Sequence, residues 1–181
     1  MISRNEALEF TRANIKNNNL FKHCLASEAV MRELARHFGE DEEQWGLSGL
    51  LHDADVELTP ANLQGKTVGE MLEGRITPAM KQAMAAHNQM TGVKPVSRFD
   101  IALTAGETVT GLIVASALII QSKKLADLTP ESLVKRFGEK RFAAGAERAL
   151  IAKCEEIGLR LSDFMGLALK AMQGIAEELG L

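Results

Sequence analysis

The sequence predicts an all-α protein, and three observations favour that fold class. Apolar residues make up 46% of the 181-residue chain, whereas aromatic residues make up only 4%. The core must therefore consist of Leu, Ala, Ile, Val and Met, a composition that suits helix packing better than sheets. Helix-start signals recur from end to end, and the apolar residues between them follow helical spacing. No strand pattern or internal repeat competes with this interpretation, and the length favours one domain.

Most of the expected helices begin at a side chain that accepts hydrogen bonds from the first helical turn. These N-cap positions are Ser3, Asp41, Thr77, Asp100, Thr129 and Ser162. In order, we expect helices over residues 3–16, 20–38, 41–52, 68–72, 77–87, 100–121, 147–157 and 163–179, and another that begins at 129. The segment 58–65 is polar, contains a proline and is expected to be a loop. The helix over 100–121 is apolar nearly all round, as a central buried helix should be.

The most informative feature is the His52-Asp53 doublet, which directly follows the apolar run 47–51. An imidazole without partners is costly to bury, and an ionised carboxylate is costlier still. A bound cation removes that cost. Histidine and carboxylate side chains together suit divalent ions such as Mn, Fe, Co, Zn or Mg. His23 upstream and His87 downstream are available as further ligands.

Glu107 is a second, independent indication of a metal site. Its surroundings, from Ile101 to Leu118, are mostly apolar, so its carboxylate needs a cation or several hydrogen-bond donors. Gly106 and Gly111 flank it and leave room for close helix packing or for a ligand. The sequence therefore predicts a divalent-metal site assembled from separate helical segments.

Each of these residues also has an ordinary structural interpretation. A single buried histidine is more often hydrogen-bonded structure than a ligand, and Asp53 alone suits a helix-end salt bridge. We expect His37 to complement a helix dipole and Cys24 to pack in the core. Asp55 and Glu57 alternate with apolar residues and are expected to be solvated loop residues.

The composition argues against several classes of function. A net charge of −3 argues against binding to nucleic acid through bulk positive charge. The longest apolar stretch, 111–120, is too short to cross a bilayer, and no apolar signal segment is visible at the N-terminus. The two cysteines match no paired metal motif and are expected to be reduced thiols. We therefore expect a cytoplasmic protein without a nucleic-acid or membrane partner.

Four stretches of the chain resemble the HD-domain superfamily of metal-dependent phosphohydrolases. Members of that superfamily are all-helical and carry a His, then a His-Asp doublet, then further histidines and a final Asp. The matching stretches are residues 22–26 (KHCLA), 49–53 (GLLHD), 86–88 (AHN) and 110–113 (TGLI). The sequence looks closest to a bacterial branch of predicted hydrolases. The resemblance implies a compact HD-like metal-binding core over residues 20–125 and a C-terminal helical extension over 126–181.

The resemblance also implies a set of metal ligands. His23, His52 and Asp53 correspond to metal ligands of the superfamily. The final acid falls at Glu107, where relatives usually have Asp, and a longer side chain would shift the ion. Asp100 is the fallback ligand.

A full two-metal site is not favoured. Gln64 stands where binuclear members often carry a histidine, and it is a poor substitute as a ligand. His87 corresponds to a later histidine that binds a second metal or the substrate phosphate in different relatives. These two positions leave a one-metal site as the simpler expectation.

The implied function is hydrolysis of a nucleotide or another small phosphorylated metabolite by water activated at a divalent ion. His23, His52, Asp53 and Glu107 would hold the ion, and Asp53 would also orient the attacking water. His87, with Lys123 and Lys124, would neutralise charge on the phosphoryl oxygens. Lys123-Lys124 is otherwise an ordinary solvated helix end.

Two alternatives stay open at this point. A non-catalytic nucleotide- or protein-binding regulatory module on the same scaffold is favoured by Glu107 and Gln64, because a site freed from catalysis drifts. A purely structural helical protein with satisfied buried histidines is the other. The C-terminal helix has an apolar face that either completes the core or forms a homodimer contact. That face consists of Phe164, Leu167, Leu169, Met172 and Ile175.

Overall fold

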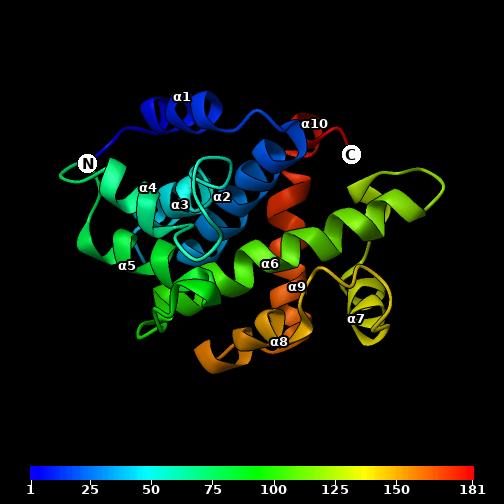
Figure 1. Cartoon of the computed structure of the whole chain (residues 1–181). Helices are drawn as coiled ribbons and strands as arrows, with labels where there is room; N and C mark the ends of the chain where they lie inside the picture. Colours follow the sequence, from blue (N-terminus) through cyan, green and yellow to red (C-terminus); the bar gives the residue numbers. More distant parts are fainter.

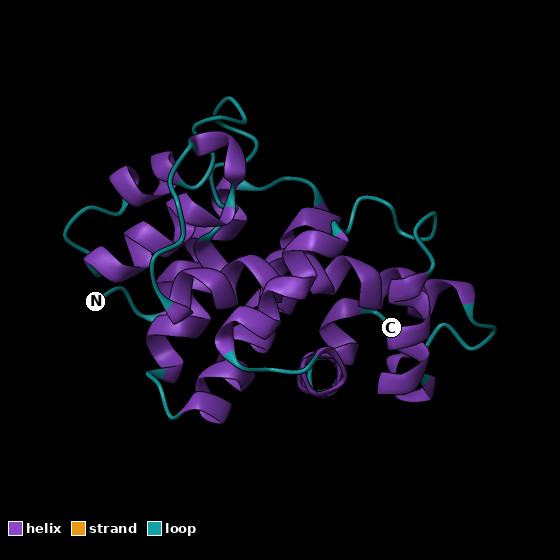
Figure 2. Ribbon diagram, turned by 90° about the horizontal axis from the view of Figure 1, so that it is seen from below, coloured by secondary structure: helices purple, strands orange, loops and turns teal.

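The structure is a computed structural model that describes residues 1–181, and it contains ten α-helices, three short 3₁₀ helices and no strand (Figures 1 and 2). The α-helices are α1 (Arg4–Asn14), α2 (Asn18–Phe38), α3 (Glu42–Leu51), α4 (Lys66–Met71), α5 (Pro78–His87), α6 (Arg98–Ile119), α7 (Pro130–Gly138), α8 (Arg148–Ile151), α9 (Leu161–Gln173) and α10 (Ala176–Leu179). The 3₁₀ helices are η1 (Gln89–Thr91), η2 (Leu125–Asp127) and η3 (Ala152–Ile157). The predicted all-α fold class is confirmed.

Helix α6 runs through the middle of the molecule, and α9 crosses behind it (Figure 1). It packs against α2 and α5 and also against α7, α8, η3 and α9. It is the only helix long and apolar enough to cross a membrane by length and composition, and 67% of its apolar window is buried inside the protein. Its apolar surface is therefore accounted for by core packing, as the sequence predicts.

The apolar face of the C-terminal helix lies in the same core. Phe164, Leu169 and Met172 are buried, and Leu167 and Ile175 pack against them as partly buried residues. Helix α9 contacts α2, α6 and α7. This apolar face therefore packs in the core of the protein and is not left exposed for contact with a second copy.

Helices α2 and α3 pack unusually close together because glycine occupies the contact. A Cβ atom added at Gly49 would lie 2.5 Å from the carbonyl oxygen of Ser27, and one added at Gly46 would lie 2.6 Å from the Arg32 side chain. The backbone of α3 therefore approaches α2 at a distance that no side chain permits. This approach brings the C-terminal end of α3, and with it His52, towards α2.

We expect Gly49→Ala to destabilise the protein by about 1–3 kcal/mol or more, because the methyl group meets backbone that cannot rotate away. The matched control is Gly138→Ala at the end of α7, where an added Cβ meets nothing within 4 Å. Urea denaturation followed by circular dichroism measures both. Equal stability of the two variants would contradict the close helix contact.

Helix boundaries differ from the sequence prediction most clearly in three regions. Asp100 does not cap α6: Ser97 is the N-cap, and Asp100 is the third residue of a capping box whose carboxylate accepts the Ser97 N–H. Helix α9 begins after Arg160 rather than at a Ser162 cap, and the expected single helix breaks at Gly174 into α9 and α10. The segment expected as one helix over 147–157 is a short α8 followed by η3.

Asp55 was expected to be solvated, and that prediction is wrong. Its side chain is fully buried, and its carboxylate accepts hydrogen bonds from the N–H groups of Gly65 and Val68 at 2.8–3.0 Å. Gly65 is the N-cap of α4 and has no side chain to cap the helix, so Asp55 satisfies the first turn from across the loop. Glu57, by contrast, is exposed as predicted and binds the backbone N–H groups of Lys16 and Asn17.

Candidate metal centre

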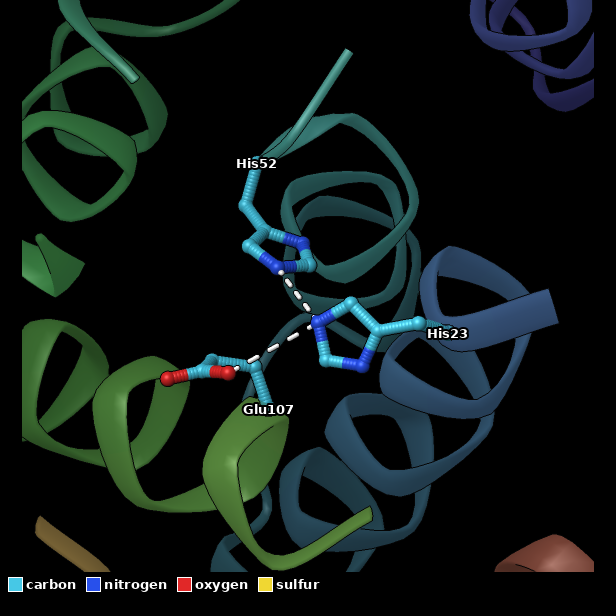
Figure 3. Close-up of side chains that lie close together, drawn as sticks. All are labelled: His23, His52 and Glu107. Atoms are coloured by element: carbon cyan, nitrogen blue, oxygen red, sulfur yellow. Dashed lines mark hydrogen bonds and ion pairs between the residues drawn. The ribbon is translucent and has the colours of Figure 1, made fainter. Parts of the chain in front are cut away.

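The His52-Asp53 doublet lies where α3 ends, and other helices bring further ligands to it. His52 is the C-cap residue of α3, His23 projects from α2, and Glu107 projects from α6. Figure 3 shows the side chains of His23, His52 and Glu107 pointing towards one another from these three helices. His87, the last residue of α5, completes the cluster around Asp53. The predicted meeting of separate helical segments is therefore found in the structure.

The hydrogen bonds of His52 and His23 fix where their protons lie. The Nδ1 atom of His52 is 2.8 Å from the carbonyl oxygen of Gly49, which can only accept, so Nδ1 carries a proton. The Nδ1 atom of His23 is 2.9 Å from the hydroxyl of Thr110. That hydroxyl already donates to the carbonyl oxygen of Glu107 at 2.7 Å, so it accepts from His23. In the neutral ring, each Nε2 therefore presents a bare lone pair.

These two Nε2 atoms face each other at 3.2 Å. Neither can donate to the other while both rings are neutral, so the pair is repulsive unless a cation lies between them. Two atoms that bind one ion at about 2.1 Å, at angles of about 90–110°, lie about 3.0–3.4 Å apart. The separation of His23 and His52 therefore fits joint coordination of one ion.

Two carboxylate oxygens extend this donor set. Glu107 Oε2 lies 3.6 Å from His23 Nε2, and Asp53 Oδ2 lies 3.7 Å from the same atom and 3.5 Å from His52 Nε2. His23, His52 and Glu107 form one group whose ligand atoms lie within 4.8 Å of one another. Two imidazole nitrogens with two carboxylate oxygens suit a borderline divalent ion. The donor set thus fits the cation that the sequence predicts.

The two oxygens of Asp53 have different partners. Oδ1 accepts a hydrogen bond from the side-chain amide of Gln64 and lies 3.3 Å from His87 Nε2. Oδ2 is left facing His23 and His52. Gln64 therefore reaches the site as a hydrogen-bond donor that orients Asp53, rather than as a replacement ligand.

His87 differs from the other two histidines in its charge. Its Nδ1 donates to the carbonyl oxygen of Met84 at 2.6 Å, and its Nε2 faces Asp53. Burial alone would lower the pKa of His87, but the hydrogen bond and negative charge of Asp53 outweigh it and raise this pKa to about 9. His87 is therefore a buried imidazolium paired with Asp53, and it also belongs to a second group of possible ligands with His52 and Asp53.

Burial and neighbouring charges set the remaining protonation states. Burial lowers the pKa of His52 to about 3, which keeps the ring neutral and able to ligate. Burial would raise the pKa of Asp53, but the surrounding histidines overcome this and hold the pKa below its usual range. Burial raises the pKa of Glu107, because the nearby histidines only partly offset it.

The centre opens into a cavity of about 620 Å³. His23, Asp53, Gln64, His87 and Glu107 form its floor, and the rest of its lining includes no Lys or Arg. One wall comes from outside the α2–α6 region: Gly145, Ala146, Glu147 and Leu150. The volume accommodates a small organic molecule next to the cluster.

Two predicted site elements are not brought to this cavity. Lys123 and Lys124 are exposed and do not line it. They follow the end of α6, whose last residue is twelve positions beyond Glu107, or about 18 Å along the helix axis. Asp100, the fallback ligand, is buried and is used to bind the N–H groups of Val96 and Ser97. Glu107, rather than Asp100, is therefore the candidate for the final acidic ligand.

Three residues have roles in the site that the sequence analysis did not predict. Thr110 fixes the ring of His23, Gln64 orients Asp53 rather than serving as a weak ligand, and Glu147 lines the cavity from a segment far along the chain. The position of Thr110 three residues after Glu107 was the available signal for the first, because it places both on one helix face. No local signal marks Glu147.

We expect Asp55→Ala to lower the free energy of unfolding by about 2–4 kcal/mol, because it leaves the buried N–H groups of Gly65 and Val68 without an acceptor. Thermal denaturation measures the change. Glu57→Ala is the control, and a comparable loss in both variants would contradict the capping role of Asp55.

Comparison with known proteins agrees with the geometry. The family model described as the HD domain matches residues 20–110, which is half of the chain. That range contains His23, the His52-Asp53 doublet, His87 and Glu107. No match was found among curated proteins or among solved structures.

Proposed function

We propose that this chain, which belongs to the HD-domain family, hydrolyses the phosphoester bond of a nucleotide or another small phosphorylated metabolite. HD domains are generally metal-dependent phosphohydrolases and bind divalent metals. The observation that carries the proposal is the pair of unprotonated Nε2 atoms of His23 and His52, 3.2 Å apart and flanked by two carboxylates. Two facing lone pairs repel each other, and a cation bound between them turns this repulsion into attraction.

His23 Nε2, His52 Nε2, Asp53 Oδ2 and Glu107 Oε2 are the atoms proposed to hold the ion. When bound there, a divalent ion supplies Lewis acidity, which lowers the pKa of a water and polarises a phosphoryl oxygen. Thr110 and the Gly49 carbonyl group keep the two imidazole rings oriented. The chain thus provides four ligand atoms, and hydrogen bonds orient the two imidazole rings among them.

His87 and Asp53 are the residues proposed to act on the substrate. His87 brings a buried positive charge to the floor of the cavity, where it can stabilise negative charge on a phosphoryl oxygen. Asp53 accepts hydrogen bonds and orients the attacking water. Lys123 and Lys124 lie outside the cavity, so this proposal assigns charge neutralisation to His87 alone.

Hydrolysis of p-nitrophenyl phosphate in the presence of Mn²⁺, Zn²⁺, Co²⁺, Fe²⁺ or Mg²⁺ tests the proposal. We expect activity that depends on one of these metals and that falls by on the order of 10²-fold or more in the His52→Ala/Asp53→Ala double variant. His37→Ala, which removes an exposed imidazole, is the matched control and should retain activity. Metal-dependent activity that persists in the double variant would refute the assignment.

A second candidate, a non-catalytic nucleotide-binding module, is favoured by one observation. Gln64 occupies Oδ1 of Asp53 with its amide, where a histidine would offer a further ligand. Calorimetric titration with nucleoside monophosphates separates the two candidates. Tight binding without any release of phosphate would favour the binding module over the hydrolase.

A further inference from the structure

The cavity of the metal centre is closed on one side by the C-terminal part of the chain. Gly145, Ala146, Glu147 and Leu150 line it together with the cluster residues, although all four follow the end of the HD-domain match at residue 110. Gly111 of α6 lines the same cavity, and its missing Cβ would be 3.7 Å from the Cβ of Ala146. This wall therefore rests directly against the helix that carries Glu107.

Arg148 holds the wall in place. Its guanidinium contacts six backbone carbonyl oxygens: those of Arg136, Phe137, Glu139, Phe142, Ala143 and Ala146. An arginine has five N–H donors, so its whole donor capacity is spent on the segment that precedes it. The backbone next to Glu147 is consequently fixed. The side chain of Glu147 therefore extends from backbone that hydrogen bonds hold in place.

The charges around the cavity are unbalanced towards the negative. Asp53, Glu107 and Glu147 line it, and no Lys or Arg contributes. A divalent ion held by Asp53 and Glu107 compensates the charges of these two carboxylates and leaves that of Glu147 without a partner in the lining. A dianionic phosphoryl group can then bind to the ion, but any further negative charge on the substrate meets Glu147 without compensation.

Glu147 itself is available to a ligand. It is exposed, it is the N-cap residue of α8, and its side chain makes no capping hydrogen bond. An exposed carboxylate at the mouth of a polar cavity attracts an ammonium group and repels a second carboxylate or phosphate.

We infer that the wall 145–150 is the leaving-group subsite and that Glu147 selects phosphomonoesters whose leaving group is cationic or neutral, with an amine preferred, over those whose leaving group is anionic. This inference rests on the proposed phosphohydrolase function and narrows it. The substrates it favours are phosphorylated amino alcohols and, next, uncharged alcohols. Nucleoside diphosphates and phosphorylated acids are disfavoured, because their leaving groups carry negative charge.

Three phosphomonoesters of matched length test the inference: 3-aminopropyl, 3-hydroxypropyl and 2-carboxyethyl phosphate. Dissociation constants come from calorimetry on the Mn²⁺-loaded full-length protein, and phosphate release is measured in parallel. We expect affinity to fall in that order, by about tenfold from first to last. Glu147→Gln should reduce the span to about threefold or less, and Glu147→Lys should reverse the order.

The control is Glu155→Gln, which removes one exposed carboxylate of the same C-terminal part that does not line the cavity. It should leave the order and the span unchanged. Equal binding of the three esters by the wild type, or the same change in Glu147→Gln and Glu155→Gln, would overturn the inference. The expected order of affinities without phosphate release would support the subsite and refute hydrolysis. Phosphate release with equal affinities for the three esters would support hydrolysis and refute the subsite.

Discussion

The His52→Ala protein is expected to bind a divalent metal at least about a hundredfold more weakly than the wild type, a loss of about 2.7 kcal/mol. His52 is fully buried, and its Nε2 is the atom closest to His23 Nε2. Its ring is kept neutral by burial, which lowers its pKa to about 3, so it needs no deprotonation before it ligates. Alanine at this position removes one ligand, and the neighbouring imidazole of His87 is already engaged with Asp53 and the Met84 carbonyl oxygen.

Elemental analysis of protein purified without added metal, followed by calorimetric titration with Mn²⁺ and Zn²⁺, measures this loss. His37→Ala should keep wild-type affinity, because its imidazole is exposed and remote from the cluster. His23→Ala provides a second test with less risk to folding, since that side chain is 23% exposed. If both His23→Ala and His52→Ala bound metal as tightly as the wild type, the proposed centre would be wrong.

Much of the centre could be predicted because burial makes its residues conspicuous. His52 and Asp53 follow an apolar run, and Glu107 lies inside an apolar helix, so each poses an energetic problem that sequence alone reveals. The all-α fold is predictable for a related reason, because apolar residues at helical spacing can be buried only as helices. In both cases the pattern of apolar and polar residues along the chain is itself the physical reason for the structure that forms.

The errors fall where a partner distant in sequence decides the outcome. Asp55 resembles a solvated loop residue until the N–H groups of Gly65 and Val68 are placed beside it. Asp100 has a suitable side chain for an N-cap, but Ser97 takes that position and uses Asp100 as its partner. Similarly, nothing near Glu147 indicates that the chain returns to the metal centre there.

The lysine pair illustrates a further limit. Lys123 and Lys124 are basic residues after a helix that contributes to the site, which made a phosphate-binding role reasonable. The length of α6 carries them away from Glu107, and Lys123 adopts φ +54° in the turn that follows. Distance along a helix can be calculated from sequence once its end is known, but helix ends are the least certain part of such a prediction.

Glu107→Asp is expected to weaken metal binding by about tenfold or more, although the resemblance to the HD-domain superfamily implies Asp at this position. Glu107 Oε2 lies 3.6 Å from His23 Nε2, just beyond the separation of about 3.0–3.4 Å expected for two ligands of one ion, so this carboxylate has no reach to lose. Removing one methylene withdraws the oxygen by about 1.5 Å, whereas ligand distances tolerate only about 0.2 Å.

Calorimetric titration with metal, together with phosphate release, gives the comparison, and Glu107→Gln serves as a companion variant that keeps the length but removes the charge. Both substitutions should weaken binding if length and charge are each required. Tighter binding and a large gain of hydrolysis in Glu107→Asp would instead mean that the longer acid impairs an enzyme site. The structure favours the first outcome, because the shorter side chain of Asp would place its carboxylate oxygen farther from His23 Nε2 than that of Glu107.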